Sequence, residues 1–170
     1  MKKYLGKIIT GVAILLGVVA IIMLVAPGLA PKSEYKDLGG DSYSMANITF
    51  GKEISAGSGF AFSFPNLLTY ILILAGIVCA VVALLGKGGK IVPIIATVAF
   101  VAAGVLYFCA QQMYMIKLPD GIPDAVADAT KDKTKEMINE MYTLGAGAIV
   151  GGIFSIVAGA AALVPVFLKK

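Results

Sequence analysis

The chain has 170 residues, of which 59% are hydrophobic and only 14% charged, and its net charge is +4. This composition is typical of membrane proteins and leaves room for one small bundle. All 14 basic residues are lysine, and the chain has no histidine, arginine or tryptophan. The absence of histidine excludes Ser-His-Asp and Cys-His pairs and imidazole metal ligands, and the absence of arginine excludes a bidentate clamp for phosphate.

The lysine and cysteine positions exclude further functions. The lysines lie in small groups at the boundaries of apolar runs, which does not favour a nucleic-acid partner. Cys79 and Cys109 both lie inside apolar runs, so we expect buried thiols rather than a disulfide framework. No segment carries a catalytic or cofactor motif. We therefore predict that the protein is not an enzyme and binds no cofactor and no metal.

Four apolar runs predict the fold class. They cover residues 8–26, 65–86, 91–113 and 142–168, and none contains a charged side chain. Each run is long enough to cross a hydrocarbon core of roughly 30 Å as a helix. The sequence therefore predicts an all-α membrane protein in which residues 1–170 form a single four-transmembrane-helix bundle.

The first run also has the features of a signal peptide. Lysines precede it, and Leu29 and Ala30 would end a cleavage site with a small residue. However, Pro31 would follow the cut, and the apolar run is long for such a peptide. A retained first span is therefore the favoured interpretation.

The lysines also predict the orientation. The segments before the first run, between the second and third runs, and after the fourth run hold seven lysines and no acidic residue. The other two loops, 27–64 and 114–141, hold the remaining seven lysines and all ten acidic residues, so the partition is +7 against −3. Lysine-rich short segments remain in the cytoplasm. We predict a multi-pass protein of the plasma membrane with cytoplasmic termini and two extracellular loops.

The first extracellular loop, 27–64, is expected to be small and β-like. Glycines interrupt short stretches that alternate in polarity, and residues 42–50 are expected to form a strand. Phe60, Phe62 and Phe64 recur with a period of two, which would place three rings on one face. These rings either seat the loop on the outer leaflet or form an exposed edge that contacts another subunit.

The second extracellular loop is expected to contain a helix that starts near Pro123. Six acidic residues recur every four positions: Asp120, Asp124, Asp128, Asp132, Glu136 and Glu140. On a 3.6-residue helix they would form a slowly winding acidic stripe. This stripe is either a solvated face or, repeated around an oligomer, a cation-attracting mouth. No helix breaker precedes Tyr142, so we expect the helix to continue into the fourth span as its extracellular extension.

The fourth span carries small residues at regular spacing. Gly147, Gly151, Ser155 and Gly159 recur every four positions. Small residues allow helices to approach closely in lipid, where little hydrophobic force drives association. This ridge is expected to pack either against other helices of the same bundle or against another subunit.

The plan of four spans with a β-like first outer loop resembles that of claudin-like and other four-span junction or pore-forming proteins. The resemblance covers topology only, because the Trp and paired Cys that mark the claudin first loop are absent. It therefore assigns no residue roles.

These patterns favour a structural or interaction protein over a transporter, because no charged residue lies inside the spans. We expect a bilayer-embedded protein that forms a homo-oligomer or joins a larger membrane complex through its small-residue helix faces and extracellular loops. The alternative is an oligomeric large-pore channel with an acidic extracellular mouth.

Overall fold

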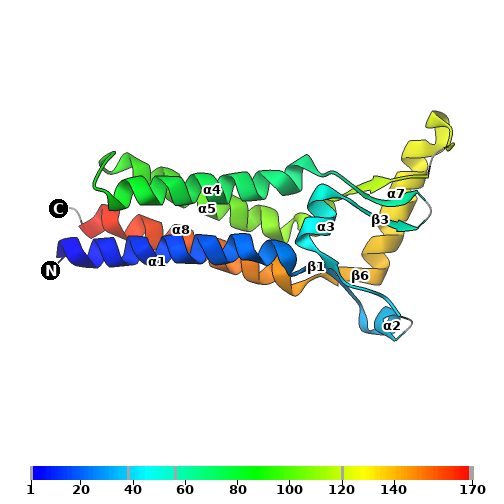
Figure 1. The fold of residues 1–170 in the computed structure, drawn as a ribbon, viewed down its shortest axis with the longest axis horizontal. Coiled ribbons are helices and arrows are strands. Elements are labelled where there is room, and N and C mark those ends of the chain that lie inside the picture. Colours follow the sequence, from blue (N-terminus) through cyan, green and yellow to red (C-terminus); the bar gives the residue numbers. More distant parts are fainter. Residues whose placement is uncertain (1, 38, 56, 120, 169–170) are drawn as a thin grey trace.

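Four long helices form a bundle, and the other segments form a head at one end of it (Figure 1). This computed structural model describes residues 2–37, 39–55, 57–119 and 121–168. The long helices are α1 (Lys2–Ile22), α4 (Phe64–Leu84), α5 (Ile91–Phe108) and α8 (Ala146–Leu168). All four, with α1 extended to Val25 by a 3-10 turn (η1, Met23–Val25), are long and apolar enough to span a membrane. The predicted multi-pass helix bundle is confirmed.

The span boundaries follow local capping signals. Ser63 caps α4, because its Oγ accepts a hydrogen bond from the Asn66 amide at 3.4 Å, and Pro65 lies in the first turn. The third span is shorter than predicted, since α5 ends at Phe108 and a separate turn, α6 (Ala110–Met113), follows.

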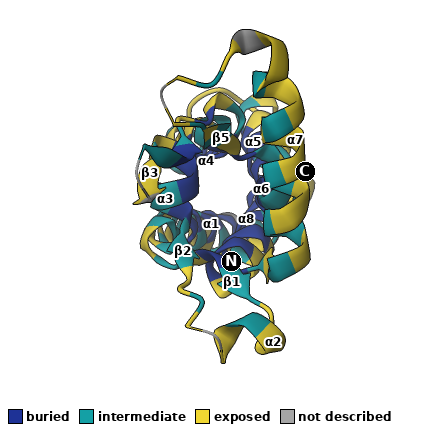
Figure 2. Ribbon diagram, turned by 90° about the vertical axis from the view of Figure 1, so that its right-hand side faces the viewer, coloured by how far each residue is buried: buried dark blue, intermediate teal, exposed yellow. Residues whose placement is uncertain are grey.

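The long helices form a ring in which α1 and α5 each pack mainly against α4 and α8. Viewed from the head, their buried residues face the middle of this ring (Figure 2). Phe100 of α5 is fully buried there. A Cβ added to Gly17 of α1 would lie 2.8 Å from the Phe100 ring, and one added to Gly76 of α4 would lie 3.0 Å from it. Large side chains therefore fill the interior of the bundle at this level.

The small-residue ridge of α8 packs inside the same chain. Gly147, Gly151, Ser155 and Gly159 are all buried. A Cβ on Gly151 would lie 2.8 Å from the ring of Tyr107 in α5. The hydroxyl of Ser155 donates a 2.8 Å hydrogen bond to the carbonyl of Phe100, also in α5. The ridge thus lets α8 approach α5 closely.

Two three-stranded antiparallel sheets build the head. One has the order β2 (Tyr43–Ser44), β1 (Pro27–Pro31), β6 (Tyr142–Leu144). The other has the order β3 (Lys52–Ser55), β4 (Ser58–Ala61), β5 (Met115–Lys117). Each sheet joins the segment between α1 and α4 to the segment between α5 and α8. Helices α2 (Ser33–Lys36), α3 (Met45–Phe50) and α7 (Asp124–Met141) complete the head, and α7 lies crosswise to the bundle (Figure 1).

The strand expected over residues 42–50 is wrong for most of its length. Only Tyr43 and Ser44 are in a strand, and the helix α3 begins at Met45. Ser44 caps this helix by accepting a hydrogen bond from the Asn47 amide at 3.2 Å. Gly51, with φ of 93°, ends it in a backbone conformation that favours glycine. The capping signals therefore outweigh the alternation in polarity.

The predicted continuous helix from the second loop into the fourth span is also wrong. Helix α7 ends at Met141, and the next three residues pair with β1, with Leu144 opposite Leu29. The Gly145 amide then donates a 2.8 Å hydrogen bond to the Gly28 carbonyl. A Cβ on Gly145 would lie only 2.4 Å from the Pro27 carbonyl oxygen. A partner more than a hundred positions away thus breaks the helix, which local helix signals cannot reveal.

The packing of the bundle predicts different effects for a Gly-to-Ala change in α8 and one in α1. Gly151→Ala should lower the free energy of unfolding by about 1–3 kcal/mol, because the new methyl group meets the Tyr107 ring. Gly11→Ala, where a Cβ meets nothing within 4 Å, should leave the free energy unchanged or raise it by up to about 1 kcal/mol. Unfolding by SDS titration in mixed micelles measures both. Equal stability of the two variants would contradict the packing of α8 against α5.

Candidate functional site

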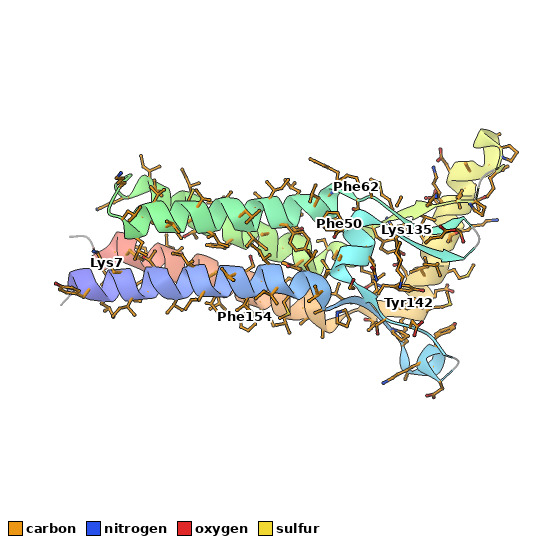
Figure 3. The ribbon with its side chains drawn as sticks, viewed as in Figure 1. Lys7, Phe50, Phe62, Lys135, Tyr142 and Phe154 are labelled. Carbon is orange, nitrogen blue, oxygen red and sulfur yellow. The ribbon has the colours of Figure 1, made fainter. Side chains whose placement is uncertain are left out.

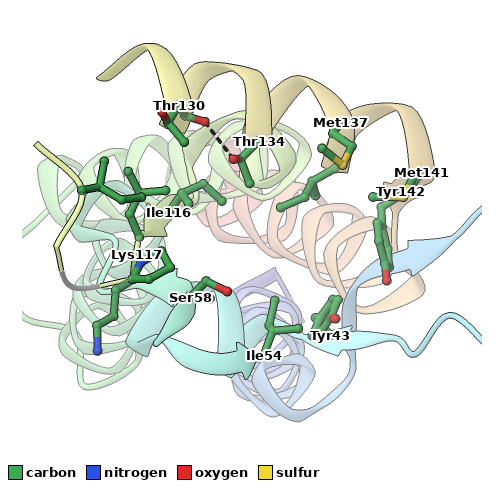
Figure 4. Close-up of a pocket in the computed structure, with 15 residues that line it drawn as sticks. Tyr43, Ile54, Ser58, Ile116, Lys117, Thr130, Thr134, Met137, Met141 and Tyr142 are labelled. Atoms are coloured by element: carbon green, nitrogen blue, oxygen red, sulfur yellow. Dashed lines mark hydrogen bonds between the residues drawn. The ribbon is translucent and has the colours of Figure 1, made fainter. Parts of the chain in front are cut away.

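A cavity of about 540 Å³ lies in the head between α7 and the strands (Figure 4). Its α7 wall includes Met137, Ile138 and Met141, together with Thr130 and Thr134. Each threonine hydroxyl donates a 2.8 Å hydrogen bond to the α7 carbonyl four positions earlier. Both hydroxyl hydrogens are therefore already in hydrogen bonds within α7, and the wall is chiefly apolar.

The opposite wall comes from the second sheet and the loop after it. It includes Ile54 of β3, Ile116 of β5, and Leu118 and Ile122 of the loop. Among the described residues that line the cavity, Lys117 is the only charged one, and its amine points away from the cavity in Figure 4. The cavity is thus enclosed mainly by uncharged side chains.

Tyr43 and Tyr142 close one end of the cavity, where their hydroxyls lie beside one another (Figure 4). Their ring centroids are 5.4 Å apart. The Phe60 ring lies 5.0 Å from Tyr43 and 5.4 Å from Tyr114. We call these four residues the aromatic row. It crosses from the first sheet to the second and so holds the two sheets together.

The pKa of Tyr43, which lines the cavity, is clearly shifted. Burial, supplemented by a hydrogen bond with Tyr142 and by the charge of Asp41, raises the pKa of Tyr43 to about 12. The amine of Lys52 lies 5.7 Å from the Tyr43 ring centroid. The phenol therefore remains neutral at physiological pH and is able both to donate and to accept a hydrogen bond.

Polar contacts at the far end of the aromatic row hold α7 in place over the cavity. The Tyr114 hydroxyl bonds to Asn139 Oδ1 at 3.1 Å and to the Lys135 carbonyl at 3.2 Å. The Lys135 amine donates to the Gln112 carbonyl and lies 5.4 Å from the Tyr114 ring centroid. Lys32 donates to the Asn139 carbonyl at 3.3 Å. These contacts connect α7 to two other segments, residues 112–114 and Lys32, and preform the cavity.

The three phenylalanines predicted to share one exposed face are separated. Phe60 is only 3% exposed, because it belongs to the aromatic row, whereas Phe62 and Phe64 are 51% and 58% exposed. Strand β4 ends at Ala61, so the period of two does not continue. Phe50, 53% exposed, lies nearby, because the Ser63 amide bonds to the Thr49 carbonyl at 2.8 Å (Figure 3). We call Phe50, Phe62 and Phe64 the aromatic edge.

The acidic stripe lies on other positions of α7 than those that line the cavity. Its members Asp128, Asp132, Glu136 and Glu140 are exposed, and Asp120 lies outside the described residues. Asp128 forms a 3.2 Å ion pair with Lys131 on the same helix. This placement is typical of a solvated helix face.

The cavity was not predicted from the sequence. A signal was present, because Thr130, Thr134, Met137 and Met141 recur at spacings of four, three and four, which places them on one face of a helix. The opposite wall comes from strands that pair only in the folded chain. No protein-family model, curated protein or solved structure matches the chain.

The Tyr43 environment predicts a stability change at alkaline pH. Since the folded pKa of about 12 lies above the ordinary value of 10.0, the folded state binds the phenolic proton more tightly. This stabilisation is complete below pH 10 and is lost as the pH rises through about 12. Tyr43→Phe should therefore reduce the loss of unfolding free energy between pH 10 and about pH 12. Ultraviolet difference titration against Tyr43→Phe measures the pKa directly, and a Tyr43 pKa near 10 would contradict the described burial.

Proposed function

We propose that this chain is a structural or interaction protein of the membrane that contacts a second protein subunit through its head. The observation that carries the proposal is the aromatic edge, in which three phenylalanine side chains are each more than half exposed. Exposed aromatic clusters are typical of protein contact sites. The second subunit is either another copy of this chain or a member of a larger membrane complex.

The backbone beneath the aromatic edge is firmly held, which supports this proposal. Ser63, between two of the phenylalanines, donates its hydroxyl to the Met113 carbonyl at 2.6 Å. The Asn66 amide group donates to the Ile48 carbonyl at 3.3 Å. Because these bonds order the edge before binding, association loses less conformational entropy.

The small-residue ridge does not offer a second contact surface of this kind. Gly147, Gly151, Ser155 and Gly159 are buried within the bundle of one chain. Association between copies through this ridge would first require α8 to separate from α5. The head is therefore the favoured contact surface.

The proposed orientation places the head outside the cell. Lys7 and the turn between α4 and α5, which carries Lys87 and Lys90, lie at the end of the bundle away from the head, as do the start of α1 and the end of α8 (Figures 1 and 3). The partition of +7 against −3 in the whole sequence favours the cytoplasm for this lysine-bearing end.

An oligomeric channel remains the second candidate because the exposed carboxylates of α7 would suit a cation-attracting mouth. Phe100 and Tyr107 fill the interior of a single bundle. A pore would therefore have to form between copies. Loss of conductance in planar bilayers on changing Asp128 and Asp132 to Asn would support this candidate.

Two matched cysteine variants test the orientation. In a background without Cys79 and Cys109, Lys117→Cys should react with a membrane-impermeant maleimide on intact cells. Lys87→Cys, also at an exposed lysine, should react only after lysis. The reverse pattern would place the head in the cytoplasm.

Phe62→Ser tests the aromatic edge. Loss of an exposed aromatic anchor should weaken association by about 2 kcal/mol or more and shift the assembly toward the monomer mass. Phe167→Ser, which changes a 73% exposed phenylalanine at the opposite end, should leave the assembly unchanged. Native mass spectrometry after gentle solubilisation measures both. A wild-type protein that is monomeric without a co-purifying partner, or an unaffected Phe62→Ser assembly, would refute the proposal.

A further inference from the structure

We propose that the head cavity binds an uncharged, largely apolar small molecule whose single hydroxyl or carbonyl group faces the Tyr43–Tyr142 end. The cavity volume of about 540 Å³ lies within the range of roughly 300–1,000 Å³ that is usual for small-molecule sites. Such sites are chiefly apolar, with a few polar groups that orient the ligand. The head cavity has this composition.

The lining selects against a charged ligand. Burial of an unpaired charge among apolar side chains is strongly unfavourable. Lys117 is the only charged residue among the described lining residues, and its amine points away from the cavity (Figure 4). No charged side chain faces inward in this view to pair with a cation or an anion.

Two polar side chains of the lining, Tyr43 and Tyr142, lie together at one end, while Ser58 lies in the wall formed by the second sheet (Figure 4). The hydroxyls of Thr130 and Thr134 already donate hydrogen bonds to α7 carbonyls. When the two phenols at the cavity end bond to each other, the pair still has one hydrogen and several lone pairs for a ligand. A ligand hydroxyl or carbonyl would therefore bind beside Tyr43 and Tyr142, with its apolar part between α7 and the second sheet.

The cavity is also preformed and adaptable. The Tyr114, Lys135 and Lys32 contacts, all made within the chain, hold α7 over the strands. Met137 and Met141 line the cavity, and the flexible methionine side chain adjusts to ligands of different shape. A preformed site loses less entropy on binding than one that must first close.

Photolabelling of the whole chain in lipid nanodiscs tests the site. The probe is a long-chain primary alcohol with a diazirine near the middle of its chain, and peptide mass spectrometry maps the adducts. Adducts should appear on Ile54 and Met137, and excess unlabelled alcohol of the same length should suppress them. A probe with a quaternary ammonium or a carboxylate in place of the hydroxyl should label these residues about tenfold less.

Variants on opposite walls separate cavity binding from insertion of the probe into lipid. Thr134→Phe and Ile54→Trp should each fill the cavity and reduce its labelling about tenfold. Lys133→Phe places the same aromatic group at an exposed position of α7 and should not reduce labelling. Because the two filling variants alter different elements, a folding defect in one leaves the other as the test.

A separate double variant tests the Tyr43–Tyr142 end of the cavity. The double variant Tyr43→Phe, Tyr142→Phe should reduce labelling by the alcohol about fivefold and leave labelling by the matched alkane probe unchanged. The proposal is overturned if adducts occur only on lipid-facing side chains, if the filling variants label like the wild type, or if the charged probes label equally. It is equally overturned if Ile54 and Met137 become protected only when a co-purified polypeptide is present.

Discussion

The backbone pairing of β1 with β6 is the constraint on which the rest of the head depends. Leu29 pairs with Leu144, and the Gly145 amide bonds to the Gly28 carbonyl, so the segment before α8 is held against the segment after α1. This contact ends α7 at Met141 and turns it crosswise to the bundle. It also places Tyr142 beside Tyr43. The position of α7 over the cavity and the cavity's Tyr43–Tyr142 end therefore both follow from one pair of strands.

The aromatic row connects the two candidate surfaces of the head. Phe60 lies inside the row and is buried, while Phe62, two positions later, lies on the exposed aromatic edge. A short stretch of chain thus contributes both to the frame of the cavity and to the proposed subunit contact. Because the frame is held by ring contacts and by the Tyr114 hydrogen bonds, both surfaces are ordered before anything binds.

The bundle supports the head by close packing rather than by hydrophobic force, since lipid tails are as apolar as its side chains. Glycines admit the Phe100 ring between α1 and α4. Hydrogen bonds between helices add to this packing, because Ser155 donates to the Phe100 carbonyl and Thr97 donates to the Gly159 carbonyl at 3.1 Å. The small residues of α8 are thereby used for packing within one chain.

The four spans are predictable from the sequence, because a long uncharged apolar run has few alternatives to a membrane helix. The sequence also predicts the start of α7 near Pro123 and the spacing of the α8 ridge, which depend on neighbouring residues alone. The folded chain was needed to show where α7 ends, why Phe60 is buried while Phe62 is exposed, and that a cavity lies beneath α7. Each of these depends on strands that are distant in the sequence, and local periodicity carries no information about such partners. Helical spans satisfy their backbone hydrogen bonds locally, whereas β5 and β6 pair with β4 and β1, which lie more than fifty positions earlier in the chain.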